Sequence, residues 1–141
     1  MNYTAIIILF ALLPLWIISL YLFSRAAWSK LSNNYRSIDN FYGSNFGKFN
    51  ARINDLNYSS RLYLQYNDEG IHLSVVKRYR PFHPPVFIPW NDIHEVNKTE
   101  EKVHIIVGNH LENTPIEISM TTFKKLEETL IQYTEKVNAD L

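Results

Sequence analysis

The feature that most constrains this chain is an unbroken apolar run near its N-terminus, AIIILFALLPLWIISLYLF, from Ala5 to Phe23. A helix over this run is roughly 28 Å long at about 1.5 Å per residue, close to the ~30 Å hydrocarbon core of a bilayer. All 14 basic and all 14 acidic residues follow it. The sequence therefore predicts a transmembrane anchor over residues 1–24, followed by one water-soluble domain.

Two other kinds of segment can also contain a long apolar run: the core helix of a soluble protein and a cleaved signal peptide. The length and uniform apolarity of the run disfavour the core helix of a soluble protein. A cleaved signal peptide is disfavoured because MNYT carries no positive side chain and the run exceeds the usual ~7–15-residue signal core, although SRAA at Ser24–Ala27 is a weak cleavage site. Pro14 lies inside the run and predicts a kink rather than a break, because membrane helices tolerate proline.

Charges beside the run predict its orientation. Arg25, Lys30 and Arg36 follow it closely, whereas no charged side chain precedes it. The positive-inside rule then predicts an inner-membrane protein with one span and a cytoplasmic C-terminal domain, and the absence of cysteine agrees with a reducing compartment. Tyr21, Arg25, Trp28 and Lys30 are predicted to lie at the membrane interface, where aromatic rings and cations meet headgroups.

Residues 25–47 are predicted to extend the helix by a turn or two and then to form a linker. Trp28, Leu31 and Tyr35 recur at i, i+3 and i+7, an apolar edge that either rests on headgroups or belongs to a solvated linker. Residues 37–47 are rich in Ser, Asn and Gly, which indicates a loop.

Residues 48–141 are predicted to form the soluble domain. About seven short β-favouring segments occupy residues 48–54, 61–66, 70–76, 86–90, 94–98, 102–108 and 115–120, with a loop over 109–114 and the best hairpin signal at the turn 67–70. A helix is predicted over about residues 122–137, with Thr121 as its N-cap. Its apolar stripe is Phe123, Leu126, Leu130, Tyr133 and Val137. The fold class is therefore mainly β with one C-terminal helix, a capped barrel or sandwich after one transmembrane helix.

Composition excludes several functions. The formal net charge of zero argues against a nucleic-acid partner. No phosphate-binding loop, nucleophile motif or paired-carboxylate spacing is present, so no catalytic site, no cofactor and no enzymatic activity are predicted. The five histidines, His72, His83, His94, His104 and His110, lack ligand spacing, so no metal site is predicted, and His72 and His104 are expected on outward strand positions.

The segment KRYRPFHPP, from Lys77 to Pro85, is the best candidate for a binding loop. Lys77, Arg78 and Arg80 are suited to phosphate headgroups. The alternatives are a solvated basic turn, pairing with Asp68, Glu69 or Asp92, or a contact with a protein. Phe82 and His83 stand between prolines, which indicates either a rigid contact site for a partner or membrane, or a stiff connection with Phe82 in the core.

The order of these motifs resembles a known fold family. A hairpin with the turn YNDEGIHL, the motif IPWNDI, two further strands and a closing helix are similar to bacterial pleckstrin-homology-like and GRAM-like membrane modules. That resemblance implies a partly open barrel plugged by the C-terminal helix. Those domains usually carry a tryptophan in that helix, and residues 123–137 have none.

The whole chain also resembles a group of small bacterial single-pass membrane proteins with no established activity. The resemblance lies in Trp28, Leu31, Tyr35 and Arg36 and in the segment from Arg80 to Trp90. The expected function is a membrane-anchored cytoplasmic binding or scaffold module. Its expected partners are the bilayer, anionic lipid headgroups or another membrane protein. The alternative is an accessory subunit of a larger membrane complex that assembles through its transmembrane helix.

Overall fold

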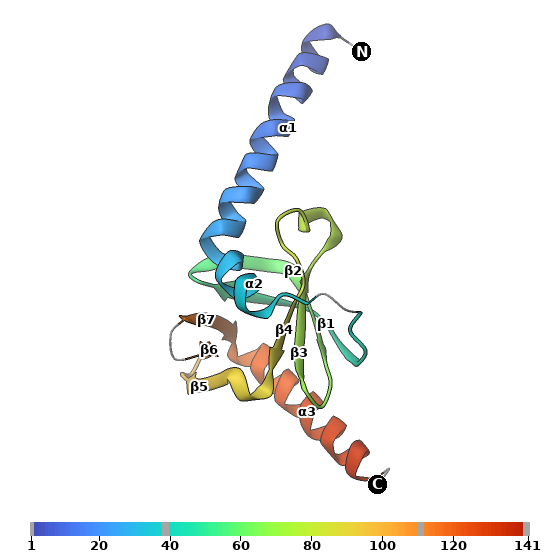
Figure 1. The fold of residues 1–141 in the computed structure, drawn as a ribbon, viewed down its shortest axis with the longest axis vertical. Coiled ribbons are helices and arrows are strands. Elements are labelled where there is room, and N and C mark those ends of the chain that lie inside the picture. The colour runs from blue at the N-terminus through green and yellow to red at the C-terminus, as the bar shows by residue number, and fades with distance from the viewer. Residues whose placement is uncertain (1, 38–39, 110–111, 140–141) are drawn as a thin grey trace.

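The computed structural model describes residues 2–37, 40–109 and 112–139, without the side chains of residues 60, 109, 112 and 133–138. Figure 1 shows a long N-terminal helix that stands away from a β domain, with a second helix at the opposite end of that domain. The predicted order of an apolar helix, a mostly β region and a C-terminal helix is confirmed.

The N-terminal helix is continuous over 33 residues, Tyr3–Tyr35, and is long and apolar enough to cross a membrane. It comprises α1 (Tyr3–Phe23), a π-helical turn (Ser24–Trp28) and α2 (Ser29–Tyr35), and α1 continues through Pro14. Leu20 is the one buried side chain of α1. Phe23 at the end of α1 packs against the core, and most of the other α1 side chains are exposed, as the side chains of a lipid-exposed helix would be.

In the described residues, seven antiparallel strands form one open sheet. The strands are β1 (Ser44–Ile53), β2 (Leu56–Tyr66), β3 (Gly70–Val75), β4 (Val86–Pro89), β5 (Ile93–Lys98), β6 (Lys102–Asn109) and β7 (Glu112–Ser119). Their order is β4-β3-β2-β1-β7-β6-β5, so two meanders meet where β1 pairs with β7. That junction is narrow, because only Arg52↔Glu117 and Ile53↔Ile116 are paired across it.

The predicted hairpin between β2 and β3 is confirmed, with Leu64 opposite Leu73. The Asn67 side chain closes its turn by accepting hydrogen bonds from the Glu69 and Gly70 N–H groups, at 2.9 and 3.1 Å. Gly70 is required there because a Cβ would collide with the carbonyl group of Ile88 on β4. The sequence signal and the steric requirement therefore coincide at this turn.

A second hairpin, between β1 and β2, was not expected. Its two turn residues, Asn54 and Asp55, have φ angles of 48° and 65°. Two successive residues with positive φ are typical of the two-residue turns that fit the twist of a hairpin, and Asn and Asp tolerate this conformation. The pair Asn54-Asp55 was thus a usable turn signal.

Three predicted boundaries are corrected below, and β2 also begins earlier than predicted, at Leu56 instead of residue 61. β1 begins at Ser44, so the last residues assigned to the linker form a strand instead. The loop between β6 and β7 is shorter than predicted, because the strands extend to Asn109 and from Glu112, and His110 and Leu111 lie outside the described residues.

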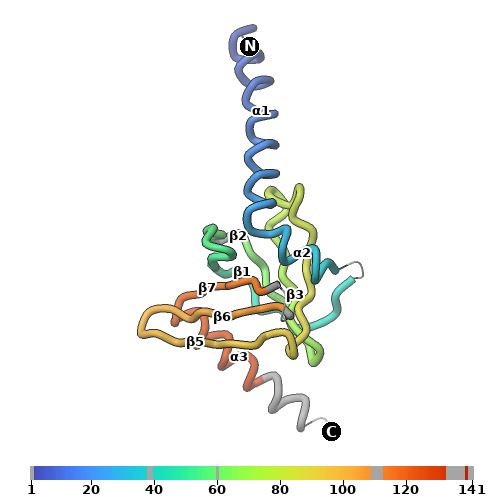
Figure 2. Tube along the Cα trace, turned by 60° about the vertical axis from the view of Figure 1, so that its left-hand side comes forward, coloured from blue at the N-terminus to red at the C-terminus, as the bar shows by residue number. Residues whose placement is uncertain are grey.

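The third corrected boundary is the start of α3 (Met120–Ala139). The oxygen that caps it is the Ser119 Oγ, which accepts a hydrogen bond from the Thr122 N–H at 3.1 Å, and not Thr121. Figure 2 shows α3 under the sheet, and three residues of the predicted stripe, Phe123, Leu126 and Leu130, pack against the core. The side chains of Tyr133 and Val137 lie outside the described ones.

The juxtamembrane helix is part of the domain core. Ala27, Trp28 and Leu31 are fully buried and belong to the same cluster as the apolar side chains of the sheet. The backbone continues this contact, because Arg36 forms a bridge to Val86 on edge strand β4. The first part of the predicted linker is therefore a structural component of the domain.

Candidate membrane-facing site

The loop between β3 and β4 lies beside the last turns of α1 (Figure 1). The Phe82 ring meets the Tyr21 ring edge-on with centroids 5.3 Å apart, and the Ser24 hydroxyl donates a hydrogen bond to the Phe82 carbonyl oxygen. Tyr21 is two residues from the end of the apolar run. The loop is therefore level with the point where the apolar helix ends.

An aromatic joint of Phe23, Trp28, Tyr58 and His83 connects this helix to the domain. Phe23 and Tyr58 have ring centroids 4.9 Å apart, and Trp28 and His83 have theirs 5.7 Å apart. The Trp28 indole N–H donates to the Pro84 carbonyl oxygen at 2.7 Å, and its side chain is fully buried. The prediction that Trp28 lies at the headgroups is wrong, because the domain takes up both its apolar surface and its donor.

His83 is also buried, with 1% of its surface exposed, so it is not the exposed contact residue predicted. Its Nδ1 lies 2.9 Å from the Pro81 carbonyl oxygen, which can only accept, so Nδ1 carries the proton. Nε2 is then the acceptor for the Tyr58 hydroxyl at 3.4 Å. Burial lowers the pKa of His83, outweighing the hydrogen bonds to the Pro81 and Tyr79 backbone, so the neutral form is favoured.

Phe82, by contrast, is 46% exposed and lies outside the core, so the alternative of a core residue is wrong for it. It occupies the third position of a turn closed by a hydrogen bond from the His83 N–H to the Arg80 carbonyl oxygen at 2.8 Å. Its φ is 64°, a conformation that favours glycine and is strained for a bulky residue. Strain of this kind is typical of functional sites.

The three predicted cations of the loop, Lys77, Arg78 and Arg80, are all exposed. Among the described residues none of them forms an ion pair, and Asp92, one of the acidic partners considered, accepts a hydrogen bond from the Tyr35 hydroxyl at 2.7 Å. The Arg80 Nε donates to the Val75 carbonyl oxygen at 3.4 Å, which positions its side chain at the base of the loop. The loop therefore presents cations to solvent beside the end of α1.

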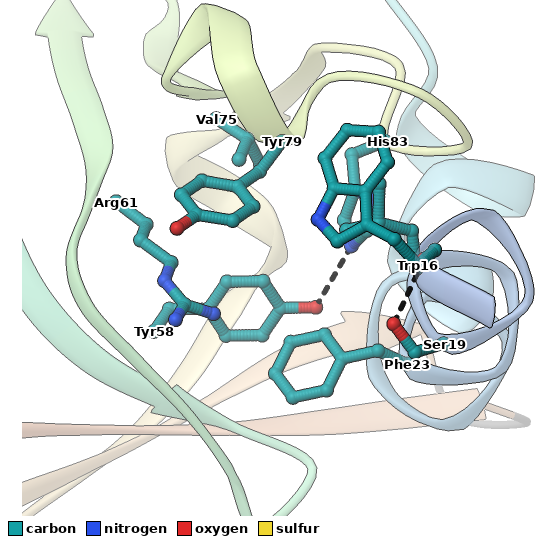
Figure 3. A pocket seen from close by; sticks show the side chains of 9 residues that line it. Trp16, Ser19, Phe23, Tyr58, Arg61, Val75, Tyr79 and His83 are labelled. Carbon is teal, nitrogen blue, oxygen red and sulfur yellow. Dashed lines mark hydrogen bonds between the residues drawn. The ribbon is translucent and has the colours of Figure 1, made fainter. Parts of the chain in front are cut away.

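A cavity of about 340 Å³ lies between α1 and the domain (Figure 3). Its helix wall is Trp16, Ser19, Leu20 and Phe23, and its domain wall is Tyr58, Arg61, Val75, Tyr79 and His83. The Arg61 guanidinium lies over the Tyr79 ring, 4.4 Å from the centroid. The sequence alone did not single out Arg61, since one wall of the cavity comes from a helix about forty residues earlier.

The remaining predicted interface residues, Tyr21, Arg25 and Lys30, are exposed. The Arg25 guanidinium donates to the Tyr21 hydroxyl at 3.0 Å, so a ring and a cation are joined at the end of the span. Their exposure is compatible with headgroup contact, which stays a prediction.

The other histidines give no metal site: no group of three or more His, Cys, Asp or Glu side chains in the described part of the chain could hold an ion. His72 is corrected from an outward position to a buried one, stacked on Phe41 with centroids 4.9 Å apart. Burial is the main cause that lowers the pKa of His72, and the charge of Arg80 adds to it.

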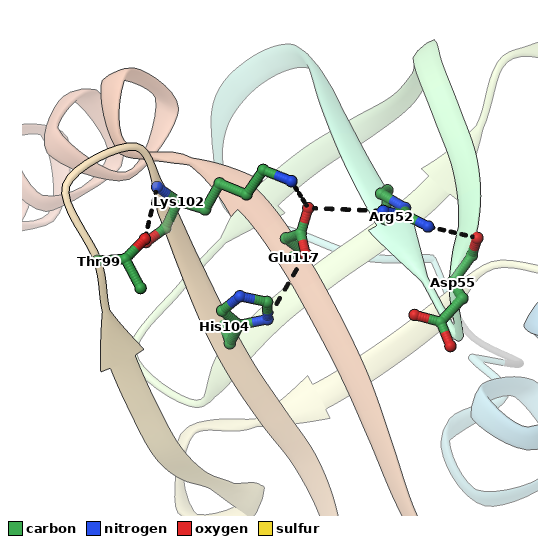
Figure 4. A network of polar contacts seen from close by, with 6 residues as sticks. All are labelled: Arg52, Asp55, Thr99, Lys102, His104 and Glu117. Carbon is green, nitrogen blue, oxygen red and sulfur yellow. Dashed lines mark hydrogen bonds and ion pairs between the residues drawn. The ribbon is translucent and has the colours of Figure 1, made fainter.

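His104 belongs to a polar network around Glu117 on β7 (Figure 4). Lys102 Nζ lies 3.0 Å from the Glu117 carboxylate, and Arg52 and His104 approach it at 4.0 and 3.6 Å. The hydrogen bond from Lys102 is the main cause that lowers the pKa of Glu117. Because Arg52 is on β1 and Lys102 on β6, the network supports the narrow junction between the two meanders.

The candidate site thus combines an apolar helix end, an exposed cationic loop and a cavity with an arginine on its domain wall. Comparison with known proteins adds no relative: no family model, no curated protein and no solved structure matches the chain.

Proposed function

We propose that this protein is a single-pass membrane protein whose C-terminal domain is a cytoplasmic binding module, rather than an enzyme, that contacts anionic lipid headgroups. The contact surface would be the β3–β4 loop with Lys77, Arg78 and Arg80, together with Arg61 in the adjoining cavity. The observation that carries the proposal is the contact between Phe82 and Tyr21. It holds the exposed cations beside the end of an apolar helix long enough to span a bilayer.

The magnitudes favour a weak contact that orients the domain. Each cation near an anionic leaflet contributes ~1 kcal/mol, so three contribute about 3 kcal/mol, or roughly a hundredfold in affinity. The span already holds the domain at an effective concentration in the millimolar range. Headgroup binding therefore has only to select one orientation of the loop, and a tight pocket is unnecessary.

Two further features support the proposed fold and the proposed location of the domain. A pleckstrin-homology-like fold is supported by seven antiparallel strands in two meanders with a C-terminal helix packed on their core. Inner-membrane location with a cytoplasmic domain is supported by the exposure of Arg25, Lys30 and Arg36 directly after the span.

The test uses the full chain in lipid nanodiscs, because Trp28 and Leu31 belong to the domain core and a truncated domain would lose them. The sequence contains no cysteine, so single fluorescent labels can be attached at Pro81→Cys in the loop and at Asn97→Cys on exposed β5 as the control. Spin-labelled lipids then quench whichever label lies at the headgroups.

The proposal expects quenching of the loop label that is stronger in anionic than in neutral nanodiscs and that weakens with salt. Combined replacement of Lys77, Arg78 and Arg80 by alanine should remove the anionic preference, and the β5 label should respond in neither case. Equal quenching of both labels, or no effect of the replacements, would contradict headgroup contact. A stoichiometric membrane partner lost when Ala5–Phe23 is exchanged for an unrelated span would instead favour the accessory-subunit alternative.

A further inference from the structure

A second cavity, of about 270 Å³, lies between the sheet and α3. Its walls are aliphatic and aromatic side chains of the strands on one side and Phe123, Leu126 and Leu130 of α3 on the other. Thr122 is the one hydroxyl-bearing residue among the described lining. The cavity shares no residue with the membrane-facing cavity, so it is a separate site.

The size of the cavity limits its occupant. An engineered apolar cavity of about 150 Å³ holds benzene, so this one has space for a chain of about ten carbons. Two hydrocarbon chains would not fit. A helix or strand of a protein partner is also far too wide for it.

A polar cleft adjoins the cavity between β1 and α3. This cleft, of about 200 Å³, shares Phe46, Phe49 and Thr122 with the cavity and adds Lys48, Asn50 and Lys125. Both lysines are exposed, and within the described residues neither forms an ion pair. The Lys125 ammonium lies 5.5 Å from the centre of the Phe46 ring, so this cation is next to the wall of the apolar cavity.

A different contact joins the other side of α3 to the sheet. Lys98 on β5 forms an ion pair with Glu127 at 3.7 Å, and its ammonium lies 4.6 Å from the centre of the Phe123 ring. These contacts connect β5 directly to α3. The cleft beside β1 is therefore where the apolar cavity meets two lysines without an ion pair among the described residues, of which Lys48 also lies 5.4 Å from the centre of the Tyr63 ring.

We propose that the cavity and the cleft form one binding site for a single-chain fatty acid of about ten to twelve carbons. The hydrocarbon chain occupies the apolar cavity, and the carboxylate lies in the cleft between Lys48 and Lys125, with the Thr122 hydroxyl as a hydrogen-bond donor. An apolar cavity that opens next to two cations fits an anionic amphiphile better than a neutral one, because both ends of the ligand are then satisfied.

The test uses the full chain in phosphatidylcholine nanodiscs, with carboxyl-labelled decanoate observed by carbon NMR and empty nanodiscs as the reference. The proposal expects a saturable signal of one decanoate per chain that is absent from empty nanodiscs. Over octanoate, decanoate and dodecanoate the affinity should rise by about fourfold per methylene until the cavity is full. Decanol should bind more weakly than decanoate because it carries no charge for the two lysines.

Matched variants separate the two parts of the site. Leu126→Trp fills the cavity and should weaken binding by about tenfold or more, whereas Ile131→Trp on an exposed position of the same helix should not. Lys125→Glu should weaken binding by about tenfold, because it exchanges an attraction for a repulsion, and Lys124→Glu should do so much less. Leu130→Phe is a milder filling variant if Leu126→Trp does not fold.

Three results would overturn the proposal. One is the absence of any signal beyond that of empty nanodiscs for all chain lengths. Another is equal weakening by Leu126→Trp and Ile131→Trp, which would indicate binding outside the cavity. The last is equal affinity for decanol and decanoate together with a decanoate affinity that Lys125→Glu does not change. This result would mean that the cleft does not bind the carboxylate.

Discussion

The indole N–H of Trp28 donates a 2.7 Å hydrogen bond to the carbonyl oxygen of Pro84, fifty-six residues later in the chain. This contact joins the helix that continues from the apolar span to the cationic loop. It makes the position of the loop relative to the apolar helix a property of the folded core rather than of a flexible linker.

Trp28 is expected to be essential for stability. Trp28→Ala should lower the free energy of unfolding by about 3–5 kcal/mol, because it removes a fully buried aromatic side chain. Trp28→Phe should cost about 1–3 kcal/mol, because the Pro84 carbonyl loses its donor. Denaturant unfolding in mild detergent measures both, with half-exposed Trp16→Phe as the control. An equal effect of Trp16→Phe would contradict the assigned role of Trp28.

The two buried histidines predict instability in mild acid. Burial lowers the pKa of both His72 and His83, so the folded state takes up a proton less readily than the unfolded state. The stability that the two neutral histidines contribute is fully present at pH values above the ordinary histidine pKa of about 6.5. It is lost as the pH falls from there toward the lowered pKa of the folded state.

His83→Gln should lower stability at pH 7, because the aromatic joint loses a packed ring. Between pH 7 and pH 5, however, the free energy of unfolding of this variant should fall by less than that of the unchanged protein. His72→Gln should act in the same direction. Exposed His94→Gln serves as the control, and an unchanged pH profile in both buried variants would contradict the prediction.

Phe82 should matter more for membrane contact than for folding. Phe82→Gly relieves a positive φ that costs about 1–2 kcal/mol, while it loses the contact with Tyr21. The two effects oppose each other, so the free energy of unfolding should change by no more than about 1 kcal/mol. Quenching of the loop label in nanodiscs should nevertheless fall. A large loss of stability would mean that Phe82 is a core residue after all.

The turn between β1 and β2 offers a matched pair of variants. Asp55→Gly should stabilise the protein by roughly 0.5–1 kcal/mol, because Asp55 has a φ of 65°. Asn54→Gly should gain less or nothing, because the Asn54 side chain donates a hydrogen bond to the Ala27 carbonyl oxygen at 3.1 Å. Thermal unfolding measures the difference between them, and the reverse order would show that the Ala27 contact contributes little.

Local signals in the sequence predicted most of the elements. The apolar run predicted α1, the alternation around Asn67–Gly70 predicted the β2–β3 hairpin, and the stripe containing Phe123 and Leu126 predicted α3. Each of these patterns is complete within one element or one turn, so no knowledge of distant contacts is needed to interpret it.

The site was less predictable, because it depends on contacts between distant segments. The i, i+3, i+7 spacing of Trp28, Leu31 and Tyr35 is the same whether the helix faces headgroups or a protein core, and only the position of the β3–β4 loop decides between them. His83 and Arg61 acquire their surroundings in the same way, from residues of α1. The cations of the loop are exposed because charge alone keeps them in solvent, and their contact with headgroups stays a prediction.

The helix from Tyr3 to Tyr35 has no break between the span and the buried Leu31. Each residue of a helix turns the chain by about 100° around its axis, so one residue inserted in the π-helical turn would rotate the sheet around the helix axis by about that angle. Torque applied to the span by a neighbouring helix would likewise reach the sheet. The direction in which the sheet faces around this helix is therefore set by the rotation of the apolar segment about its own axis.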